Sequence, residues 1–411
     1  MKSTEYRGAT KSTEYRGAMK STEYRGAMTS KQRFLTAIAR GRPDRLPVTT
    51  HHLMPYFLDR YMGGISNDEC FARFGMDPIR WVYPHKPDPA AGTYFNPNQT
   101  GTGFLEVRLI ASDEWRIEME DTPTDKGRTT RYRFVTPSKT LTMATESNQY
   151  TTWVTEPLVK EKGDIDVIAK HVTTPLCDVE AVNREADAYG ETGLIRGHIA
   201  TFDVFGQPGC WQDACCLYGT EKMIMETFDD PSWVHQFLRI LQKRKLGYIA
   251  SMKGARFDIN ELGGGDASSS VISPALFDEF VAPYDTEVIR AAHEVGQRIV
   301  YHTCGGMMAI LERVAGMRPD AMETFTPVGM GGDAVLAEAK KRIGDKVCMI
   351  GGFNQGYYFS RATEEEVRAA VRTCWQDAGR DGGYILAPSD HFFDSDPKLI
   401  AAFADEARKC G

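Results

Sequence analysis

Residues 257–306 read FDINELGGGDASSSVISPALFDEFVAPYDTEVIRAAHEVGQRIVYHTCGG. The apolar runs at 257–265 and 298–306 have the length of buried strands, and the sequence between them predicts helix. Ser273 before Pro274 is a helix start signal, because a capping side chain precedes proline at the first helical position. A strand–helix–strand unit with nearly continuous apolar strands is typical of a parallel α/β fold.

The same alternation of helices and short apolar strands continues from about residue 157 onward. Further strands are predicted at 194–202, 321–327, 347–354 and 384–391, with a short first strand, DRLPV, at 44–48. Other helix start signals are Asp230-Pro231, Asp396-Pro397 and the pair Thr363 and Glu366. At least seven such units favour a distorted (β/α)8 TIM barrel over a doubly wound sheet. Neither GxGxxG after a strand nor GxxxxGKS/T is present, which argues against dinucleotide and P-loop sites.

Two segments differ from this pattern. Residues 92–155 contain β-prone runs separated by Pro, Gly, Asp and Ser, which predict antiparallel hairpins in a β-rich insertion. Residues 1–27 contain KSTEYRGA three times, spaced nine residues apart. We interpret this repeat as an added tag, because solenoid repeat units need about 20–50 residues. Residues 28–411 are then predicted to form a single barrel domain that includes the insertion.

Composition excludes several functional classes. The chain has 411 residues and a net charge of −7; without the repeats, 384 residues carry −10. This charge disfavours non-specific binding of nucleic acid, and no apolar run reaches the roughly 18 residues of a membrane span. The nine cysteines form no CxxC pair, which excludes a zinc ribbon and favours a reduced cytoplasm over a disulfide scaffold.

Polar side chains gather where the predicted strands end. They are His198, Glu261, Asp266, His302, Cys304, Glu323, Asn354, Gln355, Asp390 and His391. A single such residue is readily explained as a capping group or a satisfied core residue. Because the carboxyl ends of barrel strands converge on one face, six consecutive strand ends of this kind predict a shared site.

The most specific signal is His302 and Cys304 in YHTCGG. Residues at i and i+2 of a strand point to the same side, and imidazole nitrogen with thiolate sulfur suits Zn²⁺. A buried histidine beside an inert cysteine is the structural alternative. Candidates for a third ligand are Asp390, His391, Glu261 and Cys348, although Cys348 lies mid-strand and is interpreted as core. Of His51 and His52, we expect one to face the site and the other to face away.

An aromatic substrate is suggested by Phe392, which follows Asp390 and His391 and offers a ring for stacking. His198, His52, Asn354 and Trp211 are further candidates for substrate binding, with core packing as the alternative for Trp211. Hydrolytic chemistry is disfavoured because the sequence contains neither a GxSxG elbow nor an HExxH motif.

Three blocks resemble the uroporphyrinogen decarboxylase superfamily. They are TSKQRFLTAIARGRPDRLPV (29–48), VISPALFDEFVAPYDTEVIRAAHEVGQRIVYHTCGG (271–306) and GGYILAPSDHFF (382–393). The resemblance covers about residues 29–411 and implies a distorted TIM barrel. Porphyrinogen decarboxylases carry Arg-Gln-Ala-Gly-Arg after the first strand, whereas this chain has HHLMP at 51–55. Without those arginines to bind propionates, porphyrinogen decarboxylation is disfavoured.

The His302-x-Cys304-Gly motif looks like the zinc motif of the corrinoid-dependent methyltransferases of this superfamily. In those enzymes a later cysteine, in an Ala-Pro-Gly-Cys-Gly context, completes the zinc site. Here Ala-Pro-Ser-Asp-His (387–391) stands in that place, so the resemblance makes Asp390 the substitute ligand. An oxygen-richer site is a harder Lewis acid and suits an ether oxygen better than a thiol.

The closest resemblance is to the methyltransferase I component of aryl-ether O-demethylases. It implies transfer of a methyl group from a methoxylated aromatic to the cob(I)alamin of a separate corrinoid protein. Zinc, or a general acid such as His391 or Glu261, would stabilise the leaving phenolate oxygen, and Glu323 would support zinc or substrate. The alternatives are a methylcobamide:thiol methyltransferase of the coenzyme M type and, third, a decarboxylase without metal. Relatives of this fold often form homodimers, so a homodimer is expected.

Overall fold

The structure is a computed structural model that describes residues 27–99, 107–204 and 206–411. The repeat at 1–27 therefore lies, except for its last residue, outside the described residues. No helix in the described part of the chain has the length and apolar character needed to cross a membrane.

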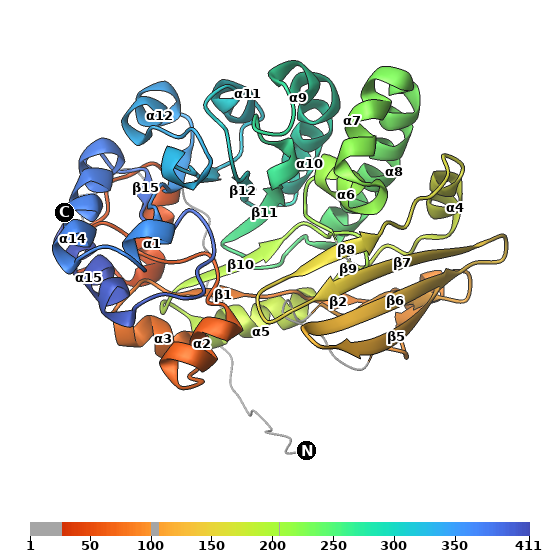
Figure 1. The fold of residues 1–411 in the computed structure, drawn as a ribbon, viewed down its shortest axis with the longest axis horizontal. Helices are drawn as coiled ribbons and strands as arrows, with labels where there is room; N and C mark the ends of the chain where they lie inside the picture. The colour runs from red at the N-terminus through yellow and green to blue at the C-terminus, as the bar shows by residue number, and fades with distance from the viewer. Residues whose placement is uncertain (1–26, 100–106, 205) are drawn as a thin grey trace.

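Seven parallel strands form a curled sheet (Figure 1). In spatial order they are β1 (Ile79–Trp81), β10 (Leu194–His198), β11 (Ile259–Gly263), β12 (Ile299–His302), β13 (Ala321–Thr324), β14 (Cys348–Gly351) and β15 (Tyr384–Ile385). Val48 closes the gap between the edge strands: it bridges Leu386 in parallel, and its carbonyl accepts a hydrogen bond from the Asp77 N–H at 2.7 Å. The predicted distorted TIM barrel is confirmed. The predicted strand 44–48 is reduced to this one bridge residue, and the three-residue β1 was missed.

Helices surround the outside of the curled sheet (Figure 1). They are α2 (Pro55–Met62), α3 (Asn67–Phe74), α5 (Val179–Tyr189), α6 (Cys210–Tyr218), α7 (Thr220–Asp229), α8 (Pro231–Ser251), α9 (Pro274–Phe280), α10 (Ala282–Glu294), α11 (Leu311–Gly316), α12 (Leu336–Ile343), α13 (Gln355–Tyr358), α14 (Glu364–Cys374) and α15 (Pro397–Ala407). The predicted caps are present: Asp230, Ser273 and Asp396 each accept from a backbone N–H, and Thr363 forms a capping box with Glu366.

The β-rich insertion is confirmed and lies in the connection that leaves the carboxyl end of β1. Its elements are β2 (His85–Lys86), β3 (Thr93–Phe95), β4 (Ile110–Ser112), β5 (Arg116–Thr124), β6 (Gly127–Val135), β7 (Thr140–Ser147), β8 (Thr152–Glu156), α4 (Asp164–His171) and β9 (Leu176–Cys177). Strands β5–β8, yellow to orange in Figure 1, form one antiparallel sheet to one side of the barrel. Buried Trp115 joins the two parts, because its indole donates to the Asp203 carboxylate at 2.9 Å. Residues 100–106 of the predicted β-rich region 92–155 lie outside the described residues.

The side chains inside the barrel change from apolar to charged between two successive layers. At the amino end, α1 (Ser30–Ile38) covers an apolar layer to which Phe34, Leu194, Val300 and Cys348 belong, so the interpretation of Cys348 as core is confirmed. Side chains two residues further along a strand point the same way. The next layer consists of Trp81, Arg196, Glu261, His302, Glu323, Ile350 and Ala387. Charged groups thus occupy the layer nearest the carboxyl ends, where barrel enzymes build their sites.

Candidate active site at the carboxyl end of the barrel

The centre of the charged layer is an ion network around Arg196. Its Nη2 donates to Glu261 Oε2 at 2.7 Å, and its Nη1 donates to Glu323 Oε2 at 3.0 Å. Burial acts to raise the pKa of Glu323, but Arg196 and His51 outweigh it and hold that pKa well below its usual range. Burial also acts to raise the pKa of Glu261, but His302, His51 and Arg196 together lower it. Both glutamates are therefore ionised at neutral pH.

His302 links this network to Cys304. Its Nδ1 lies 2.9 Å from Glu323 Oε1, and its Nε2 lies 3.1 Å from Cys304 Sγ. Burial alone would lower the pKa of His302, but the charges of Cys304 and Glu261 raise it well above the usual value. The strand alternation therefore places His302 and Cys304 side by side, as their i and i+2 spacing predicts.

This pair fits a zinc ion in its donor chemistry and in its support. One nitrogen and one sulfur ligand of a tetrahedral zinc stand about 3.5 Å apart, close to the observed separation. Glu323 bonds Nδ1 and so directs Nε2 toward Cys304, which is the carboxylate–histidine arrangement found behind ligating histidines.

Asp390 does not join this pair. Its side chain is 53% exposed, and its carboxylate accepts from the His391 N–H at 2.7 Å. No hydrogen bond or ion pair connects it with His302 or Cys304, all three of which are described residues. Its role as the third zinc ligand stays a prediction. Within the described part of the chain, Cys304 belongs to no cluster of three or more metal-binding side chains.

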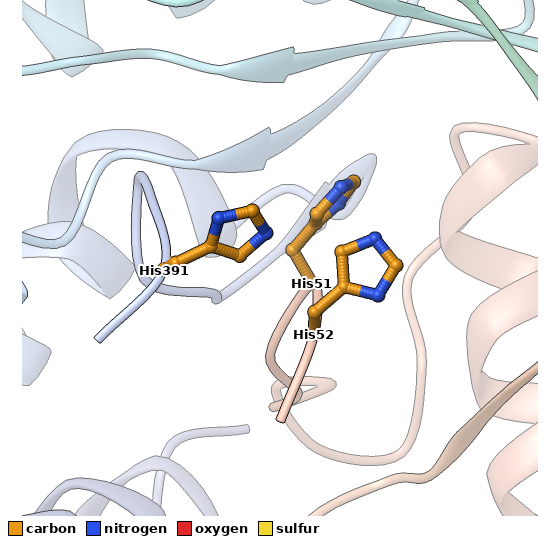
Figure 2. Close-up of side chains that lie close together, drawn as sticks. All are labelled: His51, His52 and His391. Carbon is orange, nitrogen blue, oxygen red and sulfur yellow. The ribbon is translucent and has the colours of Figure 1, made fainter. Parts of the chain in front are cut away.

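Three other histidines meet at the mouth of the barrel. Figure 2 shows His51, His52 and His391 close together, on the segment after Val48 and on the segment after β15. The expectation that one of His51 and His52 faces away is wrong, because this segment is not a strand and strict alternation does not apply. Burial and the neighbouring His51 lower the pKa of His391 to about 4 and that of His52 well below its usual value. Both rings are therefore neutral at neutral pH.

Three predicted substrate contacts have packing or capping contacts in the structure. Trp211 is 1% exposed and donates to the Asp266 carbonyl at 3.1 Å. Phe392 is buried, with its ring 5.0 Å from that of Phe57. Asn354 caps α13 by accepting from the Tyr357 N–H at 3.1 Å. These contacts favour core packing and capping for the three residues, and their role as substrate contacts stays a prediction.

His198 is the exception, because it belongs to an aromatic row that sequence reasoning missed. Its ring lies 4.8 Å from that of Tyr83, which stacks on Trp81 at 5.8 Å. Trp81 in turn stacks on His52 at 4.4 Å. The available signal was RWVYPH (80–85), where Trp81, Tyr83 and a further histidine alternate. Arg196 was missed as well, although it stands two residues before His198 on the same strand.

A small cavity opens among these groups. Its lining is Thr49, His51, Ile79, Arg196, Glu323, Thr324, Ile350, Ala387 and Pro388. Arg196 is the only Lys or Arg in that lining, and both of its carboxylate partners lie beside it.

Comparisons with known proteins agree with the barrel. A family model described as uroporphyrinogen decarboxylase (URO-D) matches residues 192–410. The uroporphyrinogen decarboxylase of Thioalkalivibrio sulfidiphilus is 28% identical over 193 residues, covering 45% of this chain and 51% of that protein. That of Aliivibrio salmonicida is 25% identical over 224 residues, covering 51% and 59%. The chain thus spans about half the length of the curated relatives it matches. A solved methyltransferase from Methanosarcina mazei has a TM-score of 0.60 at 15% identity, with 93% of this chain and 99% of that chain covered, and it shares the fold.

Proposed function

Because the chain belongs to the uroporphyrinogen decarboxylase family, we propose that it is a zinc-dependent methyltransferase of that fold. Its substrate is a methoxylated aromatic, and the methyl acceptor is the cob(I)alamin of a separate corrinoid protein. The observation that carries the proposal is the contact of 3.1 Å between His302 Nε2 and Cys304 Sγ at the barrel mouth, with Glu323 behind the imidazole. His302 and Cys304 would hold the ion, and Asp390 would have to move toward them to serve as a third ligand.

Porphyrinogen decarboxylation is disfavoured by the charge of the mouth. A substrate with several carboxylates needs cationic partners, and Arg196 is the only Lys or Arg that lines the described cavity. Its guanidinium bonds Glu261 and Glu323, and burial of all three side chains keeps water from weakening these ion pairs. No cation in the cavity lining is left for a propionate.

The chain's own residues divide into supporting and substrate-facing groups. Glu261 and Glu323 stay ionised, and Glu323 orients His302, so we assign both as positioning residues. Zinc, when bound, supplies Lewis acidity that stabilises the phenolate oxygen of the leaving group. Neutral His391, whose side chain is 34% exposed, would face that oxygen and donate a hydrogen bond to it.

The aromatic row gives the substrate ring a place to stack. Tyr83 lies between Trp81 and His198, and the insertion that borders the mouth begins directly after this segment. Aromatic pairs contribute about 0.5–1.5 kcal/mol beyond the area they bury, enough to orient a small ring. The corrinoid protein would reach the same mouth from solvent.

Absorbance of the corrinoid tests this function. The purified chain is mixed with a corrinoid protein in the Co(I) state and a vanillate-like ether, and formation of methyl-Co(III) is followed. Wild type and Cys410→Ser, whose thiol contacts a backbone carbonyl of α15, should both react. His302→Ala and Cys304→Ser should lose at least a hundredfold in rate. Transfer to a free thiol with no reaction of ethers would support the methylcobamide:thiol alternative instead.

A further inference from the structure

The rings of the three histidines at the mouth lie beside one another. The ring centres of His51 and His52 are 4.4 Å apart, those of His51 and His391 5.7 Å, and those of His52 and His391 5.3 Å. One ring nitrogen of each lies within 4.8 Å of the other two. They come from segments more than 300 residues apart in the sequence, so the barrel itself brings them together (Figure 2).

We propose that His51, His52 and His391 bind a divalent transition-metal ion of the zinc class, at a site separate from His302 and Cys304. With Zn–N bonds of about 2.0–2.1 Å, a tetrahedral ion holds its ligand nitrogens about 3.4 Å apart and the ring centres about 5 Å apart. The three observed ring separations are distributed around that value, so small side-chain rotations complete the site. Imidazole ligands suit zinc, cobalt and nickel.

An unpartnered nitrogen supports a ligand at this point. His391 Nε2 is buried and takes part in no hydrogen bond among the described residues. Leaving a buried polar atom without a partner costs about 1–3 kcal/mol. Coordination of an ion by these rings gives such atoms a partner.

His51 belongs to two groups of side chains that could hold a metal ion, and its surroundings favour the group with His52 and His391. His51 Nε2 lies 3.5 Å from Glu261 Oε2, and its Nδ1 lies 3.6 Å from Glu323 Oε1. Whichever nitrogen His51 offers to an ion, the other faces a carboxylate, as is usual behind ligating histidines. A cluster of His51, Glu261, His302 and Glu323 is also close enough to hold a metal ion. Its carboxylates are, however, already bonded by Arg196, whose charge repels a second cation.

Three protein nitrogens leave a fourth coordination position open, as in catalytic zinc sites, and an anionic oxygen of a ligand suits that position. The inference goes beyond the proposed function, because it requires neither the ether nor the corrinoid. It changes one assignment: His391 would bind the ion, and the ion would face the substrate oxygen in its place.

Titration of chelator-stripped protein with Co²⁺ tests the proposal. Wild type is expected to bind two equivalents, one of which shows a thiolate-to-cobalt charge-transfer band. His302→Ala combined with Cys304→Ser should bind one equivalent and lack that band. His52→Ala and His391→Ala should each retain the band and lose the other equivalent. His293→Ala removes an imidazole that is half exposed and pairs with Asp320, and should still bind two equivalents.

Wild type that binds no cobalt, or a single equivalent that carries the charge-transfer band, overturns the proposal. So does unchanged stoichiometry in His52→Ala and His391→Ala. Far-UV circular dichroism checks the fold of each variant, and the wild-type stoichiometry decides the matter if a variant unfolds. If wild type binds one equivalent of cobalt and shows no charge-transfer band, zinc at His302 and Cys304 is refuted and the three-histidine site is supported.

Discussion

Replacing Arg196 with methionine would leave two carboxylates buried without their cation. The side chains of Arg196 and Glu323 are 2% and 3% exposed, and that of Glu261 is 9% exposed. Removing one partner of a buried ion pair costs about 3–5 kcal/mol. Here two adjacent carboxylates lose the same cation, so we expect a loss of about 5 kcal/mol in the free energy of unfolding. Domains of ordinary stability have only about 5–15 kcal/mol in total.

Urea denaturation of chelator-treated protein, followed by tryptophan fluorescence, measures this loss. Arg290→Met is the matched control, because that guanidinium also pairs with two glutamates, Glu287 and Glu294, but its side chain is 61% exposed and theirs are 47% and 60% exposed. An exposed pair contributes about 0–1 kcal/mol, so this variant should differ little from wild type. Adding Glu261→Gln and Glu323→Gln to Arg196→Met removes the unpaired charges and should recover most of the loss.

Two results would refute this reasoning. The first is an equal loss of unfolding free energy in Arg196→Met and Arg290→Met, which would mean that the burial of the network has no energetic consequence. The second is a triple variant no more stable than Arg196→Met, which would mean that the unpaired carboxylates are not the cause. If Arg196→Met alone does not fold, a triple variant that is soluble and folded still supports the view that the unpaired carboxylates cause the loss.

Three further predictions concern stability and metal affinity. Burial raises the pKa of Asp285 to about 6, so its contribution to stability is present below the unfolded pKa of about 3.9 and is lost as the pH rises through 6. Asp285→Asn should therefore be more stable than wild type by up to about 3 kcal/mol at pH 8, and by roughly half of that at pH 5, in urea titrations. Glu323→Gln should weaken zinc binding at His302 about 10–100-fold, measured by competition with a chelating dye, since the imidazole loses its carboxylate; unchanged affinity would contradict that role. Phe134→Ala should cost about 3–5 kcal/mol, because the ring is fully buried against Trp115 in the insertion, and a thermal melt with a loss under 1 kcal/mol would contradict the packing.

The sequence predicted the barrel well because its strands are buried on both faces. Runs such as 194–202 and 298–306 consist mostly of apolar residues and glycine and lack a helical period, so they stand out from the amphipathic helices between them. Their predicted ends were too long, since β12 stops at His302 and the following residues already belong to the turn at the candidate site. β1 escaped prediction because three residues, one of them Arg80, carry too little periodicity to identify.

The site was predicted in part, and the missing part has a common cause. His302, Glu261 and Glu323 were identifiable as polar ends of apolar strands, and the structure places them in one network. Arg196 lies inside its strand and was passed over, although the alternation that pairs His302 with Cys304 also pairs Arg196 with His198. Which partner a buried charge takes depends on the neighbouring strand, and a single sequence does not contain that information.

The ion network of Arg196, Glu261 and Glu323 determines which side chains at the mouth are available to bind a metal ion. A carboxylate that is bonded to a buried guanidinium is a poor ligand for a second cation, because the ion would have to displace Arg196 into a site without water. Glu261 and Glu323 therefore act on the groups above them: Glu323 orients His302, and both face His51. The donors that remain for the proposed metal ions are the imidazoles, the Cys304 sulfur and the Asp390 carboxylate, all of which lie at the carboxyl ends of the strands or just beyond. Nitrogen and sulfur ligands favour ions of the zinc class over magnesium or calcium, so the ion network would determine the metal chemistry of the proposed sites, to which it contributes no ligand.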